Sequence, residues 1–138
     1  MAAAQTPARP TAILDASAVM AVIKGEAGWE MVAAVLDDAA VPAVNLAECA
    51  HLLALGKKFR KFTPREIDFV LQRFRTVDVT REMGLEVGRI RTSANEGKLS
   101  LGDVMCLATA SVMKLPVYTS DKEWETLGPK NVTVIQVR

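Results

Sequence analysis

The sequence predicts a single α/β domain with a mostly parallel sheet of about five strands and helices on both faces. Short apolar segments alternate with longer segments whose apolar residues recur at helical spacing. The chain has 138 residues, 50% of them hydrophobic, which suits one domain and leaves no room for a second. We expect residues 1–10, which are rich in Ala and Pro, to form a flexible leader, and residues 11–138 to form the domain.

The first strand and the first two helices are expected before residue 40. Residues 11–14 are apolar and lead directly into Asp15, whose side chain suits the N-cap of a helix over residues 17–24. Gly25 is expected to end that helix. Residues 28–39 carry apolar side chains at helical spacing, so they predict a second helix.

A short strand over residues 40–44 leads into the third and fourth helices. The third helix opens with Asn45 and Glu48, which have the spacing of a capping box. The fourth opens with Thr-Pro-Arg-Glu at residues 63–66, which combines a cap, a first-turn proline and a glutamate. We expect that helix to reach about residue 74.

The rest of the chain continues the alternation of strands and helices. The expected strands are residues 76–79, 116–119 and 132–137, and the expected helices are residues 81–93, 100–115 and 122–127. Open parallel sheets bind ligands beyond the carboxyl ends of their strands, so a site is expected at that edge.

Four acidic residues are predicted at this edge of the sheet. Asp15 and Asp121 directly follow strands, while Glu48 and Asp103 lie in the first turns of helices. Carboxylates gathered in one crevice repel one another unless a hard cation such as Mg²⁺ or Mn²⁺ compensates them. Such an ion activates water for the hydrolysis of a phosphodiester.

Helix capping is the competing explanation for each acid taken singly. Glu48 and Asp103 each lie three residues after a residue that suits an N-cap, and Asp15 and Asp121 each precede an expected helix. The joint placement of all four at one edge is what favours a metal site.

Four acidic motifs occur in order along the chain: Leu-Asp-Ala-Ser at 14–17, Ala-Glu at 47–48, Leu-Ser-Leu-Gly-Asp at 99–103 and Tyr-Thr-Ser-Asp at 118–121. This ordered set resembles the signature of PIN-domain ribonucleases, and the length resembles the VapC-like toxins of bacterial toxin–antitoxin pairs. The resemblance covers residues 13–134. It implies a Mg²⁺- or Mn²⁺-dependent endoribonuclease whose metal-binding acids are Asp15, Glu48, Asp103 and Asp121, with Ser17 and Thr119 as supporting hydroxyls.

The resemblance also implies partners: a structured RNA as substrate, a cognate antitoxin whose tail blocks the acidic crevice, and a second copy of the chain in a homodimer. The sequence departs from the family at Asn45, where a hydroxyl is common, and any further acid would be Glu123 or Glu125.

Cys49 and Cys106 lie in apolar helical stretches and favour a reducing compartment, the cytoplasm. No apolar run approaches the length of a membrane span.

The formal net charge of +1 conceals an uneven distribution. Residues 1–56 carry 2 basic and 6 acidic groups, whereas residues 57–98 carry 11 basic and 6 acidic groups. A basic run predicted to bind RNA phosphates lies in the second segment and contains Lys57, Lys58, Arg60 and Lys61. The alternative is a solvated helix end, where basic residues suit the helix dipole.

Three other side-chain types favour structural roles over chemical ones. Phe59 and Phe62 are expected to pack in the core or in an antitoxin groove rather than on bases, and His51 is expected to be structural or peripheral rather than a general base. Cys49 and Cys106 have no partner at zinc-ligand spacing and are expected in the core.

Other functions remain open at this point. A PIN nuclease can process RNA without an antitoxin, and a non-catalytic module can keep the fold for protein binding. A phosphoacceptor domain also places acids at strand ends, but Asp15-Ala16-Ser17 lacks a second aspartate two residues on.

Overall fold

A five-stranded sheet with the order β3-β2-β1-β4-β5 forms the centre of the computed structural model, which describes residues 8–138. All neighbouring strands are parallel. The strands are β1 (Ala12–Leu14), β2 (Ala39–Pro42), β3 (Thr76–Val77), β4 (Val117–Thr119) and β5 (Val134–Gln136). Most of the leader expected over residues 1–10 lies outside the described residues.

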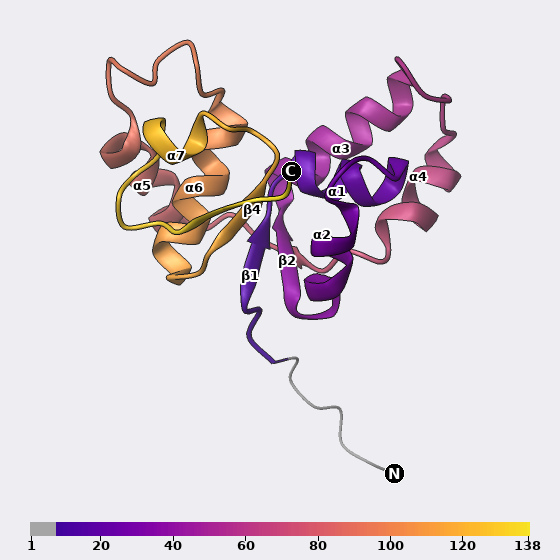
Figure 1. The fold of residues 1–138 in the computed structure, drawn as a ribbon, viewed down its shortest axis with the longest axis horizontal. Helices are drawn as coiled ribbons and strands as arrows, with labels where there is room; N and C mark the ends of the chain where they lie inside the picture. Colours follow the sequence, from indigo (N-terminus) through magenta and orange to yellow (C-terminus); the bar gives the residue numbers. More distant parts are fainter. Residues whose placement is uncertain (1–7) are drawn as a thin grey trace.

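Helices cover both faces of the sheet, which confirms the predicted fold class. They are α1 (Ala16–Lys24), α2 (Trp29–Val35), α3 (Ala43–Leu55), α4 (Pro64–Leu71), α5 (Arg81–Ile90), α6 (Leu101–Met113) and α7 (Trp124–Leu127), with a short 3₁₀ helix, η1 (Leu36–Asp38), after α2. Figure 1 shows α1 to α4 on one side of the strands and α5 to α7 on the other. None of the helices within residues 8–138 is long and apolar enough to cross a bilayer.

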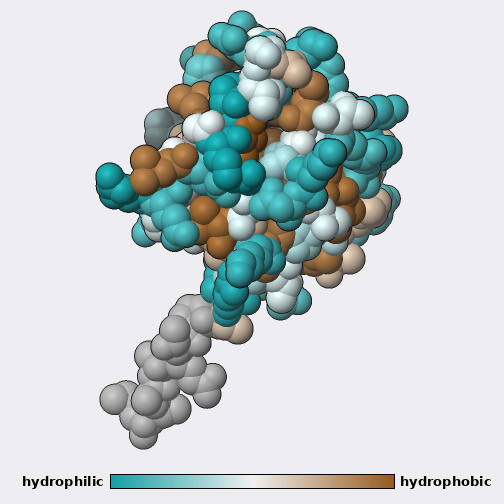
Figure 2. All heavy atoms as spheres, turned by 90° about the vertical axis from the view of Figure 1, so that its left-hand side faces the viewer, coloured by the Kyte–Doolittle hydropathy of each residue, from teal (hydrophilic) through white to brown (hydrophobic). Residues whose placement is uncertain are grey.

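Side chains of the central strand alternate between two hydrophobic cores. Ala12 and Leu14 pack with residues of α1 to α4, whereas Ile13 packs with residues of α5 to α7. This alternation follows from the two-residue period of a strand and explains why β1 is apolar throughout. On the side of α5 to α7, apolar patches lie scattered among hydrophilic side chains (Figure 2).

Several predicted helix boundaries are wrong. The second helix ends at Val35, with η1 in place of its last turn, and the fourth ends at Leu71 instead of about residue 74. Two further boundaries differ for local reasons. The third helix begins at Ala43 after Pro42, so Asn45 lies inside its first turn and is not an N-cap. The fifth helix ends at Ile90 rather than at residue 93, because the buried Asn95 amide donates a hydrogen bond to the Ile90 carbonyl. Other predicted caps are confirmed: Asp15 caps α1, and capping boxes begin α4 and α6.

Candidate functional site

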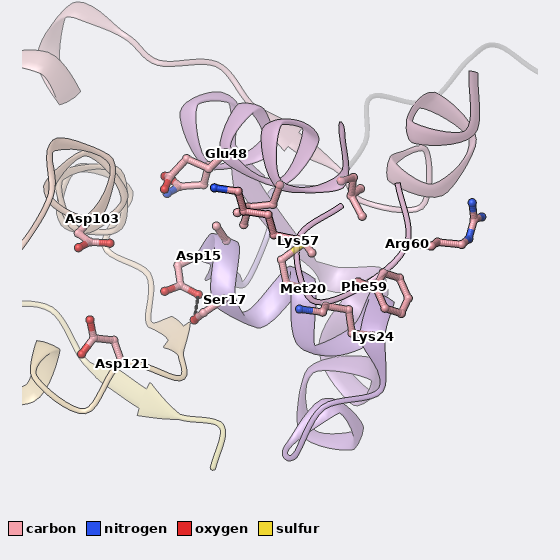
Figure 3. A pocket seen from close by; sticks show the side chains of 14 residues that line it. Asp15, Ser17, Met20, Lys24, Glu48, Lys57, Phe59, Arg60, Asp103 and Asp121 are labelled. Carbon is pink, nitrogen blue, oxygen red and sulfur yellow. Dashed lines mark hydrogen bonds between the residues drawn. The ribbon is translucent and has the colours of Figure 1, made fainter. Parts of the chain in front are cut away.

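The four predicted acids line one cavity of about 300 Å³ at the carboxyl edge of the sheet. Asp15 follows β1, Asp121 follows β4, and Asp103 lies in the first turn of α6. Glu48 lies in the second turn of α3 and not in the first as predicted, because this helix already begins at Ala43. Figure 3 shows these carboxylates towards one end of the cavity. The fold therefore brings together residues that are far apart in the sequence, as the strand-end argument predicts.

Asp15 is the most buried of the four acids, with 4% of its surface exposed. Its Oδ1 accepts hydrogen bonds from the Ser17 hydroxyl at 2.7 Å and from the Ala18 backbone N–H at 2.8 Å, and its Oδ2 accepts one from the Thr119 hydroxyl at 2.6 Å. Burial raises the pKa of Asp15 from 3.8 to about 6, although these hydrogen bonds oppose the rise and the charge of Asp103 adds to it. A buried carboxyl with a raised pKa in a cavity is typical of a functional site.

Ser17 and Thr119, the predicted supporting hydroxyls, tie Asp15 to the segment that carries Asp121. The Ser17 hydroxyl oxygen accepts a hydrogen bond from the backbone N–H of Ser120 at 2.9 Å, and the Thr119 hydroxyl oxygen accepts one from that of Asp121 at 3.0 Å. Both hydroxyls therefore fix the position of Asp15 relative to β4.

Asn45 holds Glu48 against α6. Its Nδ2 donates hydrogen bonds to Glu48 Oε1 at 2.8 Å and to the Gly102 carbonyl at 3.2 Å. A Cβ atom at Gly102 would overlap the Glu48 carboxylate, so the absence of a side chain there allows the close approach. Burial raises the pKa of Glu48, and the charge of Asp103 raises it further while Asn45 opposes the rise. The sequence analysis missed this role, which the three-residue spacing to Glu48 could have indicated.

Asp103 and Asp121 each accept a local backbone hydrogen bond. Asp103 Oδ2 accepts from the Ser100 N–H at 2.9 Å, which completes the capping box, and Asp121 Oδ1 accepts from the Glu123 N–H at 2.9 Å. The capping interpretation is therefore correct for Asp103 but wrong for Asp121, because α7 begins after Glu123 and has no side-chain cap. Both acids line the cavity. Glu123 and Glu125, the alternative further acids, are exposed and do not line it.

The donor set of this cavity fits a hard divalent cation. Carboxylate oxygens are the preferred ligands of Mg²⁺ and Mn²⁺, and Asn45 adds an amide oxygen, Oδ1, that is buried without a hydrogen-bond donor. Within residues 8–138, however, no three side chains of the His, Cys, Asp and Glu types lie close enough together to hold one ion. Each acid is instead held by its own cap, hydroxyl or amide, as expected of like charges that repel one another.

The opposite end of the cavity is basic and aromatic. Of the predicted basic run, Lys57 and Arg60 line the cavity and Lys58 and Lys61 do not. Lys24, which the sequence analysis missed, lines it as well. The missed signal is helical spacing, because Lys24 lies seven residues after Ser17 and hence on the same face of α1.

The predicted core positions of Phe62 and of the two cysteines are confirmed. Phe62 is buried and the free thiols of Cys49 and Cys106 lie in the core, where burial raises the pKa of Cys49 to about 12. His51 is exposed and does not line the cavity. Phe59 is 45% exposed and lines the cavity, so the core position predicted for it is wrong, whereas the alternative, an antitoxin groove, stays a prediction.

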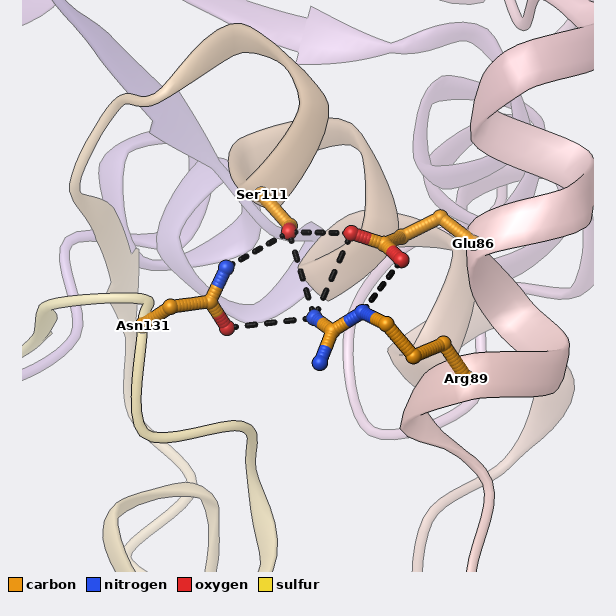
Figure 4. A network of polar contacts seen from close by, with 4 residues as sticks. All are labelled: Glu86, Arg89, Ser111 and Asn131. Carbon is orange, nitrogen blue, oxygen red and sulfur yellow. Dashed lines mark hydrogen bonds and ion pairs between the residues drawn. The ribbon is translucent and has the colours of Figure 1, made fainter.

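A second polar cluster lies away from the cavity and joins α5 to α6 and to the segment before β5 (Figure 4). Arg89 donates to Glu86, to the Ser111 hydroxyl and to the Asn131 side-chain oxygen. Ser111 in turn donates to Glu86 and accepts from Asn131. Because the donors and acceptors of these four side chains form hydrogen bonds with one another, we interpret this cluster as a structural clamp between the two helices and the segment before β5.

Comparisons with known proteins agree with this architecture. The model of the PIN domain family matches residues 12–128, while no curated protein matches the chain by sequence. A chain of DNA-bound VapBC from Salmonella typhimurium is similar with a TM-score of 0.72 and 18% identity, over 94% of this chain and 99% of that one. A chain of VapBC2 from Rickettsia felis, bound to a promoter DNA fragment, has a TM-score of 0.70 and 16% identity over 91% and 97%. A chain of VapBC-5 from Mycobacterium tuberculosis, of the VapBC family of toxin–antitoxin systems, has a TM-score of 0.60 and 24% identity over 92% and 99%. The structural likenesses show a shared fold, and the family match over most of the sequence shows that the chain belongs to the PIN domain family.

Proposed function

We propose that the chain is a Mg²⁺- or Mn²⁺-dependent endoribonuclease that cleaves a structured RNA and acts as the toxin of a toxin–antitoxin pair. The observation that carries the proposal is the set of four carboxylates from four separate segments that line one cavity of a PIN domain. The similarity to chains of VapBC systems supports the pairing with an antitoxin.

In this proposal the acids at the sheet edge move closer together to hold one or two ions, which would supply an activated water and a charge to bind the cleaved phosphate. The ligands are Asp15, Glu48, Asp103 and Asp121. Ser17 and Thr119 position Asp15 through the hydrogen bonds described above, and Asn45 positions Glu48. The buried Asp15 carboxyl is shielded from bulk water, which strengthens its interaction with a cation.

Two exposed apolar surfaces support the proposed protein partners. An apolar groove of about 350 Å³ lies between α1 and α4, and Phe69 on its rim is 75% exposed. We assign this groove to an apolar segment of the antitoxin. Trp29 and Met31 are exposed on α2, and we assign them to a homodimer contact. The free buried thiols of Cys49 and Cys106 support placement in the cytoplasm.

The test is RNA cleavage by the purified protein with Mg²⁺, with Mn²⁺ and with EDTA. The variants are Asp103→Asn and Asp121→Asn, and Asp68→Asn is the matched control because Asp68 is exposed on α4 and does not line the cavity. We expect EDTA and both cavity variants to abolish cleavage, and the control to cleave like the wild type. Full activity of folded Asp103→Asn would overturn the proposal.

The antitoxin is tested separately by growth. Expression of the chain alone should arrest growth, and co-expression of its cognate antitoxin should restore it. Cleavage without growth arrest, and without any effect of the antitoxin, would favour an RNA-processing nuclease.

A further inference from the structure

Two lysines that line the cavity have no carboxylate partner among residues 8–138. The ion pairs found among residues 8–138 join Arg60 to Glu66 and Arg89 to Glu86. Lys24 and Lys57 are in neither pair, although both line the same cavity as the four acids. Figure 3 shows the Lys24 ammonium group beside Phe59, away from Asp103 and Asp121, whereas the Lys57 side chain extends from the same side of the cavity towards Glu48. Unpaired ammonium groups there can bind an anion.

The loop after α3 presents Lys57 to the cavity through a fixed backbone conformation. Gly56 has a φ of 68°, and a Cβ atom there would overlap the backbone of Lys61. Lys58 also has a positive φ, 61°. The Phe59 N–H donates to the Gly56 carbonyl at 3.2 Å, which closes the turn. As a result Lys57 and Phe59 line the cavity, whereas Lys58 does not.

Phe59 supports the ammonium group of Lys24. The Lys24 Nζ lies 5.9 Å from the centroid of the Phe59 ring, within the range of a cation–π contact. The Phe59 ring is itself stacked on Phe62, with centroids 5.9 Å apart and an interplanar angle of 21°. Because Phe62 is buried, the core fixes Phe59, and Phe59 in turn restricts Lys24.

We propose that Lys24 and Lys57 bind a backbone phosphate of the RNA next to the phosphate held at the carboxylates, with Phe59 as a positioning residue for Lys24. This inference rests on the proposed function. An RNA strand carries a phosphate at every nucleotide, so a strand cleaved at the acidic end must place a neighbouring phosphate along the cavity. Arg60 is a weaker candidate because it pairs with Glu66 and lies 3.8 Å from the centroid of the Phe62 ring.

The test measures binding of a short fluorescent single-stranded RNA to protein that carries Asp103→Asn, which prevents cleavage. Lys24→Gln and Lys57→Gln are compared with Lys130→Gln, which removes the same charge from an exposed position outside the cavity. We expect each cavity variant to weaken binding about tenfold, the loss typical of one charged hydrogen bond. Each should also reduce the slope of log affinity against log salt by about 0.7, the value for one phosphate contact on a single strand. The control should leave both quantities unchanged.

The positioning role of Phe59 needs its own variants. Phe59→Leu should weaken RNA binding in the parent protein but have no further effect when Lys24→Gln is present, because its contribution acts through Lys24. Phe59→Tyr keeps the ring and should restore binding. An equal loss from Phe59→Leu with and without Lys24 would overturn the positioning role.

Cleavage by the variants in an otherwise wild-type chain separates this inference from the proposed function. If Asp103→Asn abolishes cleavage but Lys24→Gln and Lys57→Gln bind and cleave RNA like the wild type, the phosphate site is wrong and the nuclease assignment stands. If Asp103→Asn still cleaves RNA, the proposed function is wrong, whatever the lysine variants do. If Lys24→Gln weakens only the binding of the antitoxin, the basic end is a protein contact and the phosphate site is overturned.

Discussion

Replacement of Asp15 by asparagine should stabilise the metal-free protein at neutral pH while it abolishes cleavage of RNA. Asp15 is almost fully buried, and its pKa rises from 3.8 to about 6 because burial disfavours the charged form. At neutral pH the carboxyl is ionised in both the folded and the unfolded chain. The folded protein therefore contains a buried charge that asparagine would remove without a change of shape.

The magnitude follows from the rise in pKa. One pKa unit corresponds to about 1.4 kcal/mol, so ionised Asp15 costs the folded state about 3 kcal/mol. The asparagine Oδ1 can still accept from Ser17 and Ala18, and its Nδ2 can donate to the Thr119 hydroxyl oxygen, whose hydrogen must then turn away. We assign about 1 kcal/mol to that rearrangement. The net gain is about 2 kcal/mol, or roughly 4–8 °C in Tm.

The pH dependence distinguishes this effect from a simple change in capping. Between about pH 4 and 6 the folded chain binds the Asp15 proton more tightly than the unfolded chain, so wild-type stability should fall as the pH rises through this window. Asp15→Asn lacks this pH-dependent loss of stability, so its advantage should be greatest above about pH 6 and turn into a disadvantage of about 1 kcal/mol near pH 4, where only the cost of the rearranged hydrogen bonds remains. Chemical denaturation in EDTA across this range measures the difference, with Asp37→Asn at an exposed position as the control. Because asparagine is also a good N-cap, a role in capping alone predicts no difference at any pH, and that result would refute the reasoning.

Three further predictions concern the cavity and the clamp. Gly102→Ala should displace the Glu48 carboxylate and reduce the rate of RNA cleavage about 100-fold, since small displacements have large catalytic effects, and an unchanged rate in steady-state assays would contradict the close packing. Mg²⁺ or Mn²⁺ at about 100 times its Kd should stabilise the wild type by about 2.7 kcal/mol in a thermal melt but leave Asp103→Asn unaffected, whereas equal shifts in both proteins would place the ion elsewhere. Ser111→Ala should lower the free energy of unfolding by about 1–2 kcal/mol through loss of its contacts with Glu86, and it should leave RNA cleavage intact; a drop in cleavage by folded protein would show that the clamp is more than structural.

The edge of the sheet was predictable because it depends on local signals. Apolar strands run directly into Asp15 and Asp121, and parallel strands align their carboxyl ends, so the sequence alone predicts that these acids meet. The capping box at Ser100 likewise depends on a three-residue spacing that the structure reproduces.

For Asn45 and Lys24 the sequence carries a spacing signal, but that signal alone does not give the role of either residue. Asn45 has the spacing of a cap, but the helix begins at Ala43, so Asn45 takes a buried position whose second partner, the Gly102 carbonyl, comes from a distant helix. Lys24 lies in the last turn of α1, where a basic residue also suits the helix dipole. Only the packing of the loop after α3 brings Phe59 beneath Lys24.

Capping and metal binding are compatible at Asp103, and one pair of variants separates their contributions. The Ser100 N–H occupies Oδ2, and Oδ1 accepts no hydrogen bond from residues 8–138, so one carboxylate can fix the helix and also face the cavity. Asp103→Asn keeps an oxygen for the cap and should unfold within about 0.5 kcal/mol of the wild type, whereas Asp103→Ala loses the cap and about 1 kcal/mol. Both should be inactive, because neither keeps the charge. If Asp103→Asn kept both the cleavage activity and the stability of the wild type, Asp103 would act only by capping the helix. The acidic end of the cavity would then have three metal ligands rather than four.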